Sequence, residues 1–378
     1  MKNLKRKSIC FVIGTRPELI KQLPVYYECV KIFGKAKTLL INSGQHRNFL
    51  DFYIKEKNIK FDLTVKKNES TSSLKKNLLN SIDNFFKIFK RIMPKMVVVQ
   101  GDTTTAAGCA YAAFLNNITV VHNEAGLRTY NNKHPYPEEL NRRFITSFSD
   151  IHLAPTLTNK NNLINEGIDK RNIFVVGNPG IDNFLKTLKE KDSKEFQRII
   201  SKKNKEFKKI IFLTAHRREG VGKSFKNLFS LLKIFLKKNK DILLITTLHP
   251  NCYALRDFKK NLKNLENVYT SKPFDYLTTC KIIESSSFVI TDSGGIQEEC
   301  ATIGIPTVIC RNTTERIEAI KVGIAKLTKF NNQNLTNTLI WARKKKNNKI
   351  WKSKPYGDGN ASSKIVKVLK NHLNPISN

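Results

Sequence analysis

Short runs of apolar and β-branched residues alternate with longer amphipathic stretches along most of this 378-residue chain. The short runs predict strands, and stretches such as Thr71–Arg91 and Phe225–Phe235 predict helices. Repeated alternation of the two predicts an α/β fold with parallel, doubly wound sheets. The runs that we expect to form strands are Ser8–Ile13, Thr38–Asn42, Met96–Val99, Ile118–His122, Ile151–Ala154, Ile173–Val176, Lys209–Thr214, Ile242–Thr246, Val268–Thr270, Phe288–Thr291 and Thr307–Ile309.

This alternation is interrupted between about Asn178 and Lys209. There the sequence GNPGIDN gives way to a charge-dense stretch at residues 186–208. A chain of this length can form two domains, each large enough to bury its own core. We therefore expect two domains that are joined near residues 178–183.

The charge balance is strongly basic, with 67 Lys and Arg residues against 31 Asp and Glu residues and a formal net charge of +36. Such a balance can indicate a nucleic-acid or anionic-membrane partner. Here the excess is spread along Lys- and Asn-rich segments, such as residues 202–209 and 344–349, without a recognition module that interleaves it with aromatic residues. We interpret it as solvated helix faces and expect no nucleic-acid partner, although the charge favours an anionic substrate such as a nucleotide.

The seven cysteines form no CxxC pair, and several lie in apolar runs. They indicate reduced thiols and a cytoplasmic protein. The first apolar run, Ile9–Ile13, is too short for the core of a signal peptide, and no segment is apolar enough to span a bilayer. We therefore expect no membrane insertion. The spacings of histidines and cysteines also predict no metal site.

Three acidic residues between Val97 and Arg143 lie in distinctive surroundings. Asp102, in VVVQGDTTTAAG, and Glu124, in VVHNEAGLRT, directly follow predicted strands, and Glu138 lies in PYPEELNRR. Because the carboxyl ends of parallel strands line the ligand site of such a sheet, these carboxylates predict proton-transfer chemistry. In the structural alternative, Asp102 caps the Thr-rich helix that follows and Glu138 is an ordinary acid of a first helical turn.

The segment GTRPELIK, residues 14–21, predicts an anion site. A glycine turn after the first strand leads into a helix that carries Arg16 and Lys21. Free N–H groups at a helix N-terminus, together with these two cations, suit a phosphate. The alternative is a capped helix with basic residues on its surface.

A second segment, TDSGGIQEE at residues 291–299, predicts a nucleotide site. The N–H groups of Gly294 and Gly295 and the hydroxyl of Ser293 suit a pyrophosphate at a helix N-terminus. Glu298 or Glu299 can accept hydrogen bonds from a ribose diol. The alternative is a plain glycine-rich turn from strand to helix.

Two further strand ends carry cationic residues. In TAHRREGVGKS, residues 214–224, Arg217 stands where a phosphate-binding loop of the GxxxxGK[ST] type requires its first glycine, so that class of nucleotide hydrolase is excluded. His216, Arg217 and Arg218 remain as candidates for a phosphate clamp or, for the histidine, for acid/base chemistry, with a structural histidine as the alternative. The segment RNTTERIEA supplies Glu315 and Arg316.

Taken together, these segments resemble the non-hydrolysing UDP-N-acetylglucosamine 2-epimerases. The match runs in order from Gly14 to about Ile365 through GTRPE, GDTTT, EAGLRT, PEE-NR, HRRE, TDSGGIQEE, RNTTER and YGDG. The resemblance implies two Rossmann-like domains that face a cleft, the glycosyltransferase-B architecture. It implies a first domain at residues 1–178, on which a C-terminal helix at about 362–378 packs, and a UDP-binding domain at residues 179–361.

The resemblance also implies an activity, the interconversion of UDP-GlcNAc and UDP-ManNAc for cell-surface polysaccharide precursors. Members of the family eliminate UDP to form 2-acetamidoglucal and then add UDP back, without a metal or a nicotinamide cofactor. The resemblance also implies a homodimer. By resemblance, the acid/base residues are Asp102, Glu124 and Glu138, assisted by His216. The resemblance assigns substrate binding to Arg16, Lys21, Ser293, Gly294, Gly295 and Arg316 for the phosphates and to Glu299 for the ribose.

The chain departs from the family pattern at two places. Thr279 replaces a frequent Phe near the expected uracil site. Gln45 and His46 match one wall of an allosteric substrate site that many bacterial members have, whereas Thr247 replaces a family histidine of that site. Three alternatives remain: an epimerase of a related UDP-2-acetamido sugar, a hydrolysing epimerase that releases ManNAc and UDP, and a glycosyltransferase.

Overall fold

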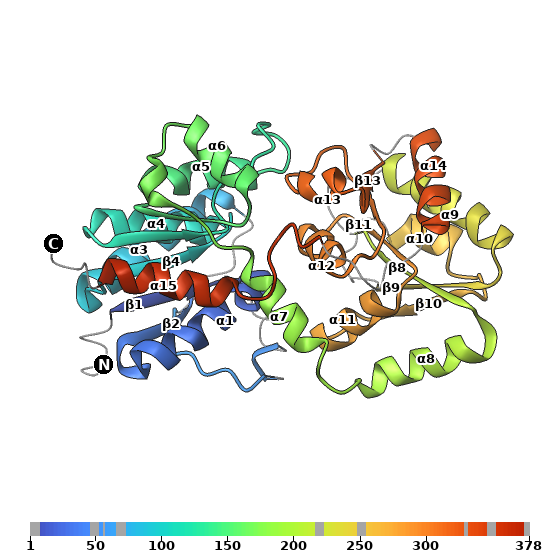
Figure 1. Ribbon diagram of the computed structural model, residues 1–378, viewed down its shortest axis with the longest axis horizontal. Coiled ribbons are helices and arrows are strands. Elements are labelled where there is room, and N and C mark those ends of the chain that lie inside the picture. Colours follow the sequence, from blue (N-terminus) through green and yellow to red (C-terminus); the bar gives the residue numbers. More distant parts are fainter. Residues whose placement is uncertain are drawn as a thin grey trace. The chain divides into compact units, whose positions relative to one another are not determined.

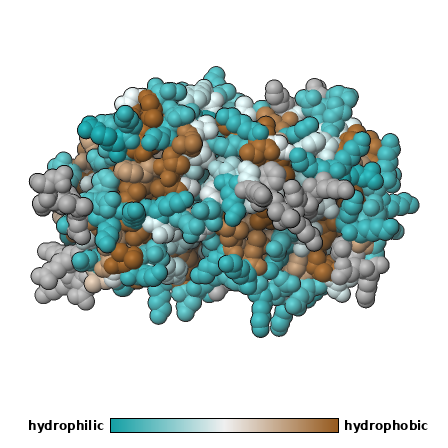
Figure 2. Space-filling view, in the orientation of Figure 1, coloured by the Kyte–Doolittle hydropathy of each residue, from teal (hydrophilic) through white to brown (hydrophobic). Residues whose placement is uncertain are grey.

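The computed structural model describes residues 8–45, 53–55, 57–65, 73–215, 223–247, 255–328, 332–345 and 353–373. The chain divides into two compact units. Unit 1 comprises residues 1–183 and 357–378, and unit 2 comprises residues 184–356. Each unit has its own sheet with helices packed on it (Figure 1). On the face drawn in Figure 2, hydrophilic residues are spread over the surface.

In the described part of unit 1, seven parallel strands form one sheet in the order β3-β2-β1-β4-β5-β6-β7. The strands are β1 (Ile9–Ile13), β2 (Thr38–Asn42), β3 (Leu63–Thr64), β4 (Met96–Gln100), β5 (Thr119–Asn123), β6 (Ile151–Ala154) and β7 (Ile173–Val175). The helices are α1 (Arg16–Phe33), α3 (Leu74–Ile92), α4 (Thr104–Leu115), α5 (Glu138–Phe148), α6 (Leu157–Asn165), α7 (Pro179–Thr187), which continues into unit 2, and α15 (Ala361–Leu373).

Unit 2 repeats this arrangement with six parallel strands among its described residues, in the order β10-β9-β8-β11-β12-β13. The strands are β8 (Lys209–Thr214), β9 (Ile242–Thr247), β10 (Val268–Ser271), β11 (Phe288–Thr291), β12 (Thr307–Ile309) and β13 (Ala325–Leu327). The helices are α8 (Lys194–Glu206), α9 (Lys223–Lys238), α10 (Leu255–Asn261), α11 (Tyr276–Ser285), α12 (Gly294–Ile303), α13 (Ile317–Lys321) and α14 (Asn332–Lys344).

The strand order reverses once in each sheet, between β1 and β4 in unit 1 and between β8 and β11 in unit 2. In such sheets, ligands bind beyond the carboxyl ends of the strands at this reversal. The GTRPE and GDTTT segments follow β1 and β4, and TDSGG begins at the end of β11. The topology therefore places these motifs at the ligand-binding edge of each sheet.

The core of unit 1 explains why its central strands are apolar throughout. Every residue of β1 and β4 is buried, because helices cover both faces of the sheet. The covering helix α4 is rich in alanine, and the small side chains of Ala106, Ala107 and Ala110 are buried against the sheet. Phe85 and Phe89 of α3 complete this core.

Helix α15 lies far along the chain but belongs to unit 1, where it packs on α1 (Figure 1). The carboxylate of Asp182 accepts hydrogen bonds from the backbone N–H groups of Ala361, at 3.1 Å, and Ser362, at 2.7 Å. A carboxylate that satisfies free N–H groups at a helix N-terminus stabilises that helix. The GNPGID segment thus anchors the start of α15.

The α/β fold class with parallel sheets is confirmed. The predicted strands at Thr38–Asn42 and Phe288–Thr291 coincide with β2 and β11. The short strands β3 and β13 were missed because β3 has only two residues and β13 is interrupted by the exposed Lys326, whereas the equally short β12 is a continuous β-branched run.

Candidate active site

Glu124 lies one residue beyond β5 and is almost fully buried. Its Oε1 accepts hydrogen bonds from Lys21 Nζ at 2.5 Å and from Asn178 Nδ2 at 3.3 Å. Its Oε2 accepts one from Gln100 Nε2 at 2.6 Å. Three donors from distant parts of unit 1 therefore converge on one carboxylate.

The backbone of Glu124 has a φ of 67°, in the left-handed region that non-glycine residues rarely adopt. A closed ring of hydrogen bonds accompanies this conformation. Asn123 Oδ1 accepts from the Glu124 N–H at 3.1 Å, and Asn123 Nδ2 donates to Gln100 Oε1 at 2.8 Å. Gln100 then donates to the Glu124 carboxylate. A strained backbone held by surrounding bonds is a common feature of functional sites.

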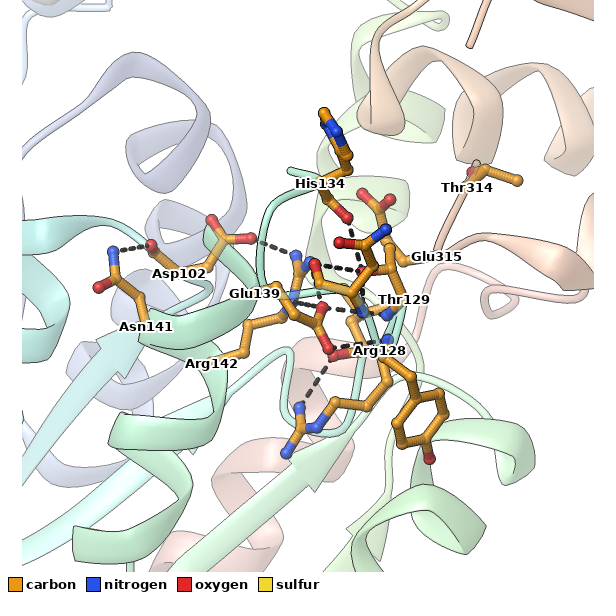
Figure 3. A network of polar contacts seen from close by, with 12 residues as sticks. Asp102, Arg128, Thr129, His134, Glu139, Asn141, Arg142, Thr314 and Glu315 are labelled. Atoms are coloured by element: carbon orange, nitrogen blue, oxygen red, sulfur yellow. Dashed lines mark hydrogen bonds and ion pairs between the residues drawn. The ribbon is translucent and has the colours of Figure 1, made fainter. Parts of the chain in front are cut away.

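Asp102 lies in the turn after β4, and its side chain is 30% exposed. Its Oδ2 pairs with Arg142 NH1 at 2.6 Å, and its backbone oxygen accepts from Asn141 Nδ2 at 2.8 Å (Figure 3). The cap of α4 is Thr103, whose hydroxyl accepts from the Ala106 N–H. The structural alternative for Asp102, a helix cap, is therefore wrong.

Glu138 is the first residue of α5 and is partly buried, so it does lie in a first helical turn. The fully buried acid is its neighbour Glu139, which accepts from the N–H groups of Thr129 at 3.0 Å and Tyr130 at 3.1 Å. Burial raises the pKa of Glu139, but these N–H groups and the Arg142 guanidinium outweigh it and hold the pKa below the usual 4.5. The first turn of α5 is thus tied to the loop that follows Glu124.

Arg128 fixes the other side of that loop. Its side chain is fully buried, and Nε and NH2 donate to the two carboxylate oxygens of Glu166 at 2.8 and 2.7 Å. NH2 also donates to Thr146 Oγ1 at 3.1 Å. Gly126 of the same EAGLRT segment packs against Asn159, where a Cβ atom would lie 2.2 Å from the backbone oxygen. These contacts explain why the segment requires both glycine and arginine.

The GTRPE segment forms a closed turn at the start of α1. The Glu18 carboxylate accepts from the N–H groups of Gly14 at 2.8 Å and Thr15 at 2.6 Å, and from Thr103 Oγ1 at 2.7 Å. Burial raises the pKa of Glu18, and these hydrogen bonds lower it only in part. Arg16 is partly buried in the first turn of α1, while Lys21, one turn later, points to Glu124.

Gln45 lies beside this turn, since a Cβ atom on Gly14 would be 3.0 Å from its Oε1. The structure therefore places Gln45 against the start of the GTRPE turn. His46 and His216 lie outside the described residues.

In unit 2, α12 begins at Gly294, so the two glycines lie inside its first turn rather than in the preceding turn. Ser293 is the N-cap residue, and its hydroxyl makes no capping hydrogen bond. The Arg316 guanidinium lies directly against Gly294, where a Cβ atom would be 2.5 Å from Cζ. By contrast, a Cβ atom on Gly295 would meet no atom within 4 Å.

Carboxylates hold Arg316 in this position. Its Nε donates to Glu298 Oε1 at 2.8 Å, and its NH1 pairs with Glu315. Glu315 also accepts from Arg311 NH1 at 2.9 Å. Unit 2 therefore keeps a cation beside the N-terminus of α12, a combination that favours anions.

Glu299 lies on the same helix and is nearly buried. Its Oε1 accepts a hydrogen bond from the Tyr276 hydroxyl at 2.9 Å. Tyr276 is the first residue of α11, three residues before Thr279. The segment that carries Thr279 thus lies next to Glu299.

The structure gathers the expected residues in two groups. Arg16, Lys21, Asp102, Glu124 and Glu138 belong to unit 1, where Lys21 pairs with Glu124, and Ser293, Gly294, Gly295, Glu299 and Arg316 belong to unit 2, where Arg316 lies against Gly294. Sequence reasoning missed the residues that hold the acids in place. The clearest available signal was polar residues inside otherwise apolar strand ends or motifs, namely Glu18, Gln100, Asn123, Glu139, Asn141, Arg142 and Asn178.

Known proteins resemble this chain over nearly its whole length. A family model described as UDP-N-acetylglucosamine 2-epimerase matches residues 31–370. The UDP-N-acetylglucosamine 2-epimerase of Campylobacter jejuni is 38% identical over 379 residues, which cover 96% of this chain and 97% of that protein. A crystal structure of UDP-GlcNAc 2-epimerase from Neisseria meningitidis, bound to UDP-GlcNAc, is 34% identical with a TM-score of 0.87, and the match covers 96% of this chain and 100% of that one.

These matches extend over nearly the whole chain, and the chain therefore belongs to the UDP-N-acetylglucosamine 2-epimerase family. The resemblance seen in the sequence is confirmed, and the family is one of epimerases, a class of isomerases. A glycosyltransferase from Rickettsia africae has a TM-score of 0.59 at 14% identity over 97% of this chain and 99% of that one, a likeness of fold alone. Among the helices that the structure describes, none has the length and apolar character of a membrane span.

Proposed function

We propose that this chain is a non-hydrolysing UDP-N-acetylglucosamine 2-epimerase that interconverts UDP-GlcNAc and UDP-ManNAc. The observation that carries the proposal is the convergence of three acid-bearing segments in unit 1. The loop after β4 carries Asp102, the loop after β5 carries Glu124, and the start of α5 carries Glu138. Arg142 and Glu139 connect these three segments.

The chemistry requires more than one proton carrier. The C2 hydrogen of the sugar is not adjacent to a carbonyl group, so its direct removal as a proton is very difficult. In the elimination, a base takes the C2 proton while the C1–O bond to UDP breaks, and 2-acetamidoglucal forms. An acid then protonates C2 on the opposite face, and a UDP oxygen adds back to C1. Asp102, Glu124 and Glu138 supply these proton donors and acceptors, with His216 assisting.

The leaving UDP requires a cationic and N–H-rich site. In unit 2, the N-terminus of α12 with Ser293, Gly294 and Gly295, together with Arg316, supports a role in holding the diphosphate. Glu299 is positioned by Tyr276 to accept hydrogen bonds from the ribose. In unit 1, Arg16 at the start of α1 offers a further cation, and Lys21 has a second role as the ion-pair partner of Glu124.

Nuclear magnetic resonance of the purified protein with UDP-GlcNAc in D₂O tests the proposal. We expect UDP-ManNAc to appear with deuterium at C2. Unchanged sugar without deuterium exchange would contradict the proposal, and free ManNAc with UDP would make the chain a hydrolysing enzyme. The same assay with other UDP-2-acetamido sugars tests whether a related sugar is the preferred substrate.

Two features of the proposal concern regulation and location. Gln45 and His46 form part of an allosteric site for the substrate, and the contact of Gln45 with Gly14 supports this, since a ligand there would press on the GTRPE turn. A sigmoidal dependence of rate on UDP-GlcNAc concentration is expected, and a hyperbolic one would contradict the allosteric role.

We also propose a cytoplasmic location, which the buried free thiols of the described cysteines support.

We also propose that the chain forms a homodimer. Aromatic residues of α4 and α5 form a cluster in which Phe148 lies 4.9 Å from Tyr111, 5.3 Å from Phe114 and 4.7 Å from Phe144, measured between ring centroids. Phe114 is 51% exposed, and exposed aromatic clusters are typical of protein interfaces. Light scattering after size-exclusion chromatography should give twice the mass of one chain, and Phe114→Asp should lower it to one. A wild-type mass of one chain would contradict the dimer.

A further inference from the structure

We infer that Arg142 is a positioning residue that holds the acid-bearing segments of unit 1 in one arrangement, an inference that rests on the proposed function. Its guanidinium lies between the carboxylates of Asp102 and Glu139 (Figure 3). Arg142 acts on the reaction through Asp102 rather than by touching the reacting sugar.

The first connection runs from Arg142 to the loop after β4. Its NH1 donates to Asp102 Oδ2 at 2.6 Å, across 40 residues of sequence. Asn141, the preceding residue of α5, donates to the backbone oxygen of Asp102 at 2.8 Å. One helical turn thus fixes both the side chain and the backbone of Asp102, which limits the rotation of its carboxylate.

The second connection runs to the loop after β5. Arg142 NH2 donates to Glu139 Oε2 at 2.8 Å, and the same oxygen accepts from the Thr129 N–H. The other oxygen of Glu139 accepts from the Tyr130 N–H. Since these amides lie only a few residues beyond Glu124, Arg142 indirectly fixes the exit of the Glu124 loop.

The third connection is covalent, because Glu138 occupies the same first turn of α5 as Glu139. A rotation of α5 that lengthened the Asp102–Arg142 contact would therefore also move Glu138. General acid/base catalysis requires each carboxylate within hydrogen-bond reach of its proton, and small displacements cost rate steeply. The guanidinium therefore fixes the spacing of all three acids through one buried group.

Lysine cannot replace this group. A guanidinium presents several N–H donors in a fixed fork and can bond two carboxylates at once, whereas an ammonium is a compact point charge. Arg142 uses NH1 for Asp102 and both Nε and NH2 for Glu139. Arg142→Lys keeps the charge but loses the bridging geometry.

The neighbouring Arg143 provides a matched control. It lies on the same helix, has the same chemistry and is exposed, whereas Arg142 is 1% exposed. Arg142→Lys should lower kcat at least tenfold and leave KM for UDP-GlcNAc within about threefold, because Arg142 acts on the acids and not on substrate binding. Arg143→Lys should leave both constants unchanged. An Arg142→Lys enzyme with wild-type kcat would overturn the inference.

Chemical rescue separates positioning from folding. Arg142→Ala should lower kcat at least 100-fold. Guanidinium chloride, added below the concentration that unfolds the protein, should raise the kcat of this variant at least tenfold. The same salt should not accelerate the wild type or Arg143→Ala. If Arg142→Ala does not fold, the lysine variant carries the test. A folded Arg142→Ala that guanidinium does not restore would overturn the inference.

A readout independent of turnover distinguishes this inference from the proposed function. Hydrogen–deuterium exchange at the Thr129 and Tyr130 amides should accelerate in Arg142→Lys, because Glu139 loses its bridge, and should stay unchanged in Arg143→Lys. Failure of the wild type to form UDP-ManNAc would remove the proposed function alone. Unchanged exchange at these two amides in Arg142→Lys would contradict the positioning role of Arg142 and leave the proposed function untouched.

Discussion

Unit 1 and unit 2 hold their candidate residues by different physical means. In unit 1, side chains from distant segments fix Glu124 and Asp102, namely Lys21 and Gln100 for Glu124 and Arg142 for Asp102. In unit 2, the backbone start of α12 forms the candidate site, and Arg316 lies against Gly294. Under the proposed function, we therefore expect unit 1 to control where a proton moves and unit 2 to hold an anion. Variants of the acids in unit 1 should therefore change turnover, and variants of the α12 site in unit 2 should change nucleotide affinity.

The largest effect should follow removal of the acids in unit 1. Asp102→Asn, Glu124→Gln and Glu138→Gln each remove a proton carrier while keeping the shape of the side chain. Each should lower kcat by roughly 10²-fold or more, measured by NMR conversion of UDP-GlcNAc. The affinity for UDP, measured by titration calorimetry, should stay within about threefold of wild type. Near wild-type turnover in all three variants would contradict the assignment of proton transfer to unit 1.

The next effect concerns the two glycines of α12, which form a matched pair in unit 2. Gly294→Ala places a methyl group 2.5 Å from Arg316 Cζ and must displace the guanidinium, whereas Gly295→Ala meets no atom within 4 Å. We expect Gly294→Ala to weaken UDP binding by about tenfold or more, the loss of one charge-assisted contact. Gly295→Ala should leave the fold and the position of Arg316 unchanged. Equal UDP affinity in wild type and Gly294→Ala would contradict the role of Arg316.

An effect of similar size should follow removal of one hydrogen bond from each unit. Gln100→Leu removes the donor to Glu124, and Tyr276→Phe removes the donor to Glu299. A bond to a charged group contributes about 1.5–3 kcal/mol, so changes of roughly 10-fold or more are expected. Gln100→Leu should lower kcat with UDP affinity unchanged, and Tyr276→Phe should weaken UDP binding. The reverse pattern would show that the two units do not divide their work in this way.

The last effect is on stability, is smallest near neutral pH, and distinguishes the units as the pH falls. Burial lowers the pKa of His122 to about 3 and that of His152 to about 4, from a usual 6.5. Below pH 6.5 the unfolded chain binds protons that the folded chain excludes, so stability falls as pH drops from 6.5 towards 3. Each histidine contributes up to about 1.4 kcal/mol per pH unit within its window.

Both histidines lie in the sheet of unit 1, on the paired strands β5 and β6. The protection of β5 and β6 amides against hydrogen exchange, corrected for the intrinsic exchange rate at each pH, should therefore fall between pH 6.5 and 4, and His152→Gln should reduce that dependence. His134, which is exposed, serves as the control, and His134→Gln should change nothing. Corrected protection in β5 and β6 that does not vary with pH would contradict the assignment.

The sequence allowed prediction of features that depend on local patterns. Alternation of strands and helices predicted the parallel sheets, and the position of Asp102 and Glu124 after strands predicted their place at the ligand edge. The candidate anion-binding turns were inferred from glycine and cation spacing, as at Ser293 and Gly294, and their role stays a prediction.

Contacts between distant segments could not be predicted. The pairs Asp102–Arg142 and Glu124–Asn178 join residues 40 and 54 positions apart, and no local pattern links them. The pairing of Lys21 with Glu124 is of the same kind, since each residue alone suggested a different role. Such pairs depend on the order of strands in the sheet, which brings separate loops to one edge.

The return of α15 has a consequence for biosynthesis. Unit 1 is assembled from two separate parts of the chain, residues 1–183 and 357–378, whereas unit 2 is continuous. Helix α15 buries Ile365, Val366 and Leu369. The Asp182 carboxylate can form its hydrogen bonds to the Ala361 and Ser362 amides only after these residues have been synthesised. Unit 2 therefore has all its residues outside the ribosome before unit 1 does. The part that carries the three acids is completed last, after synthesis has passed residue 373.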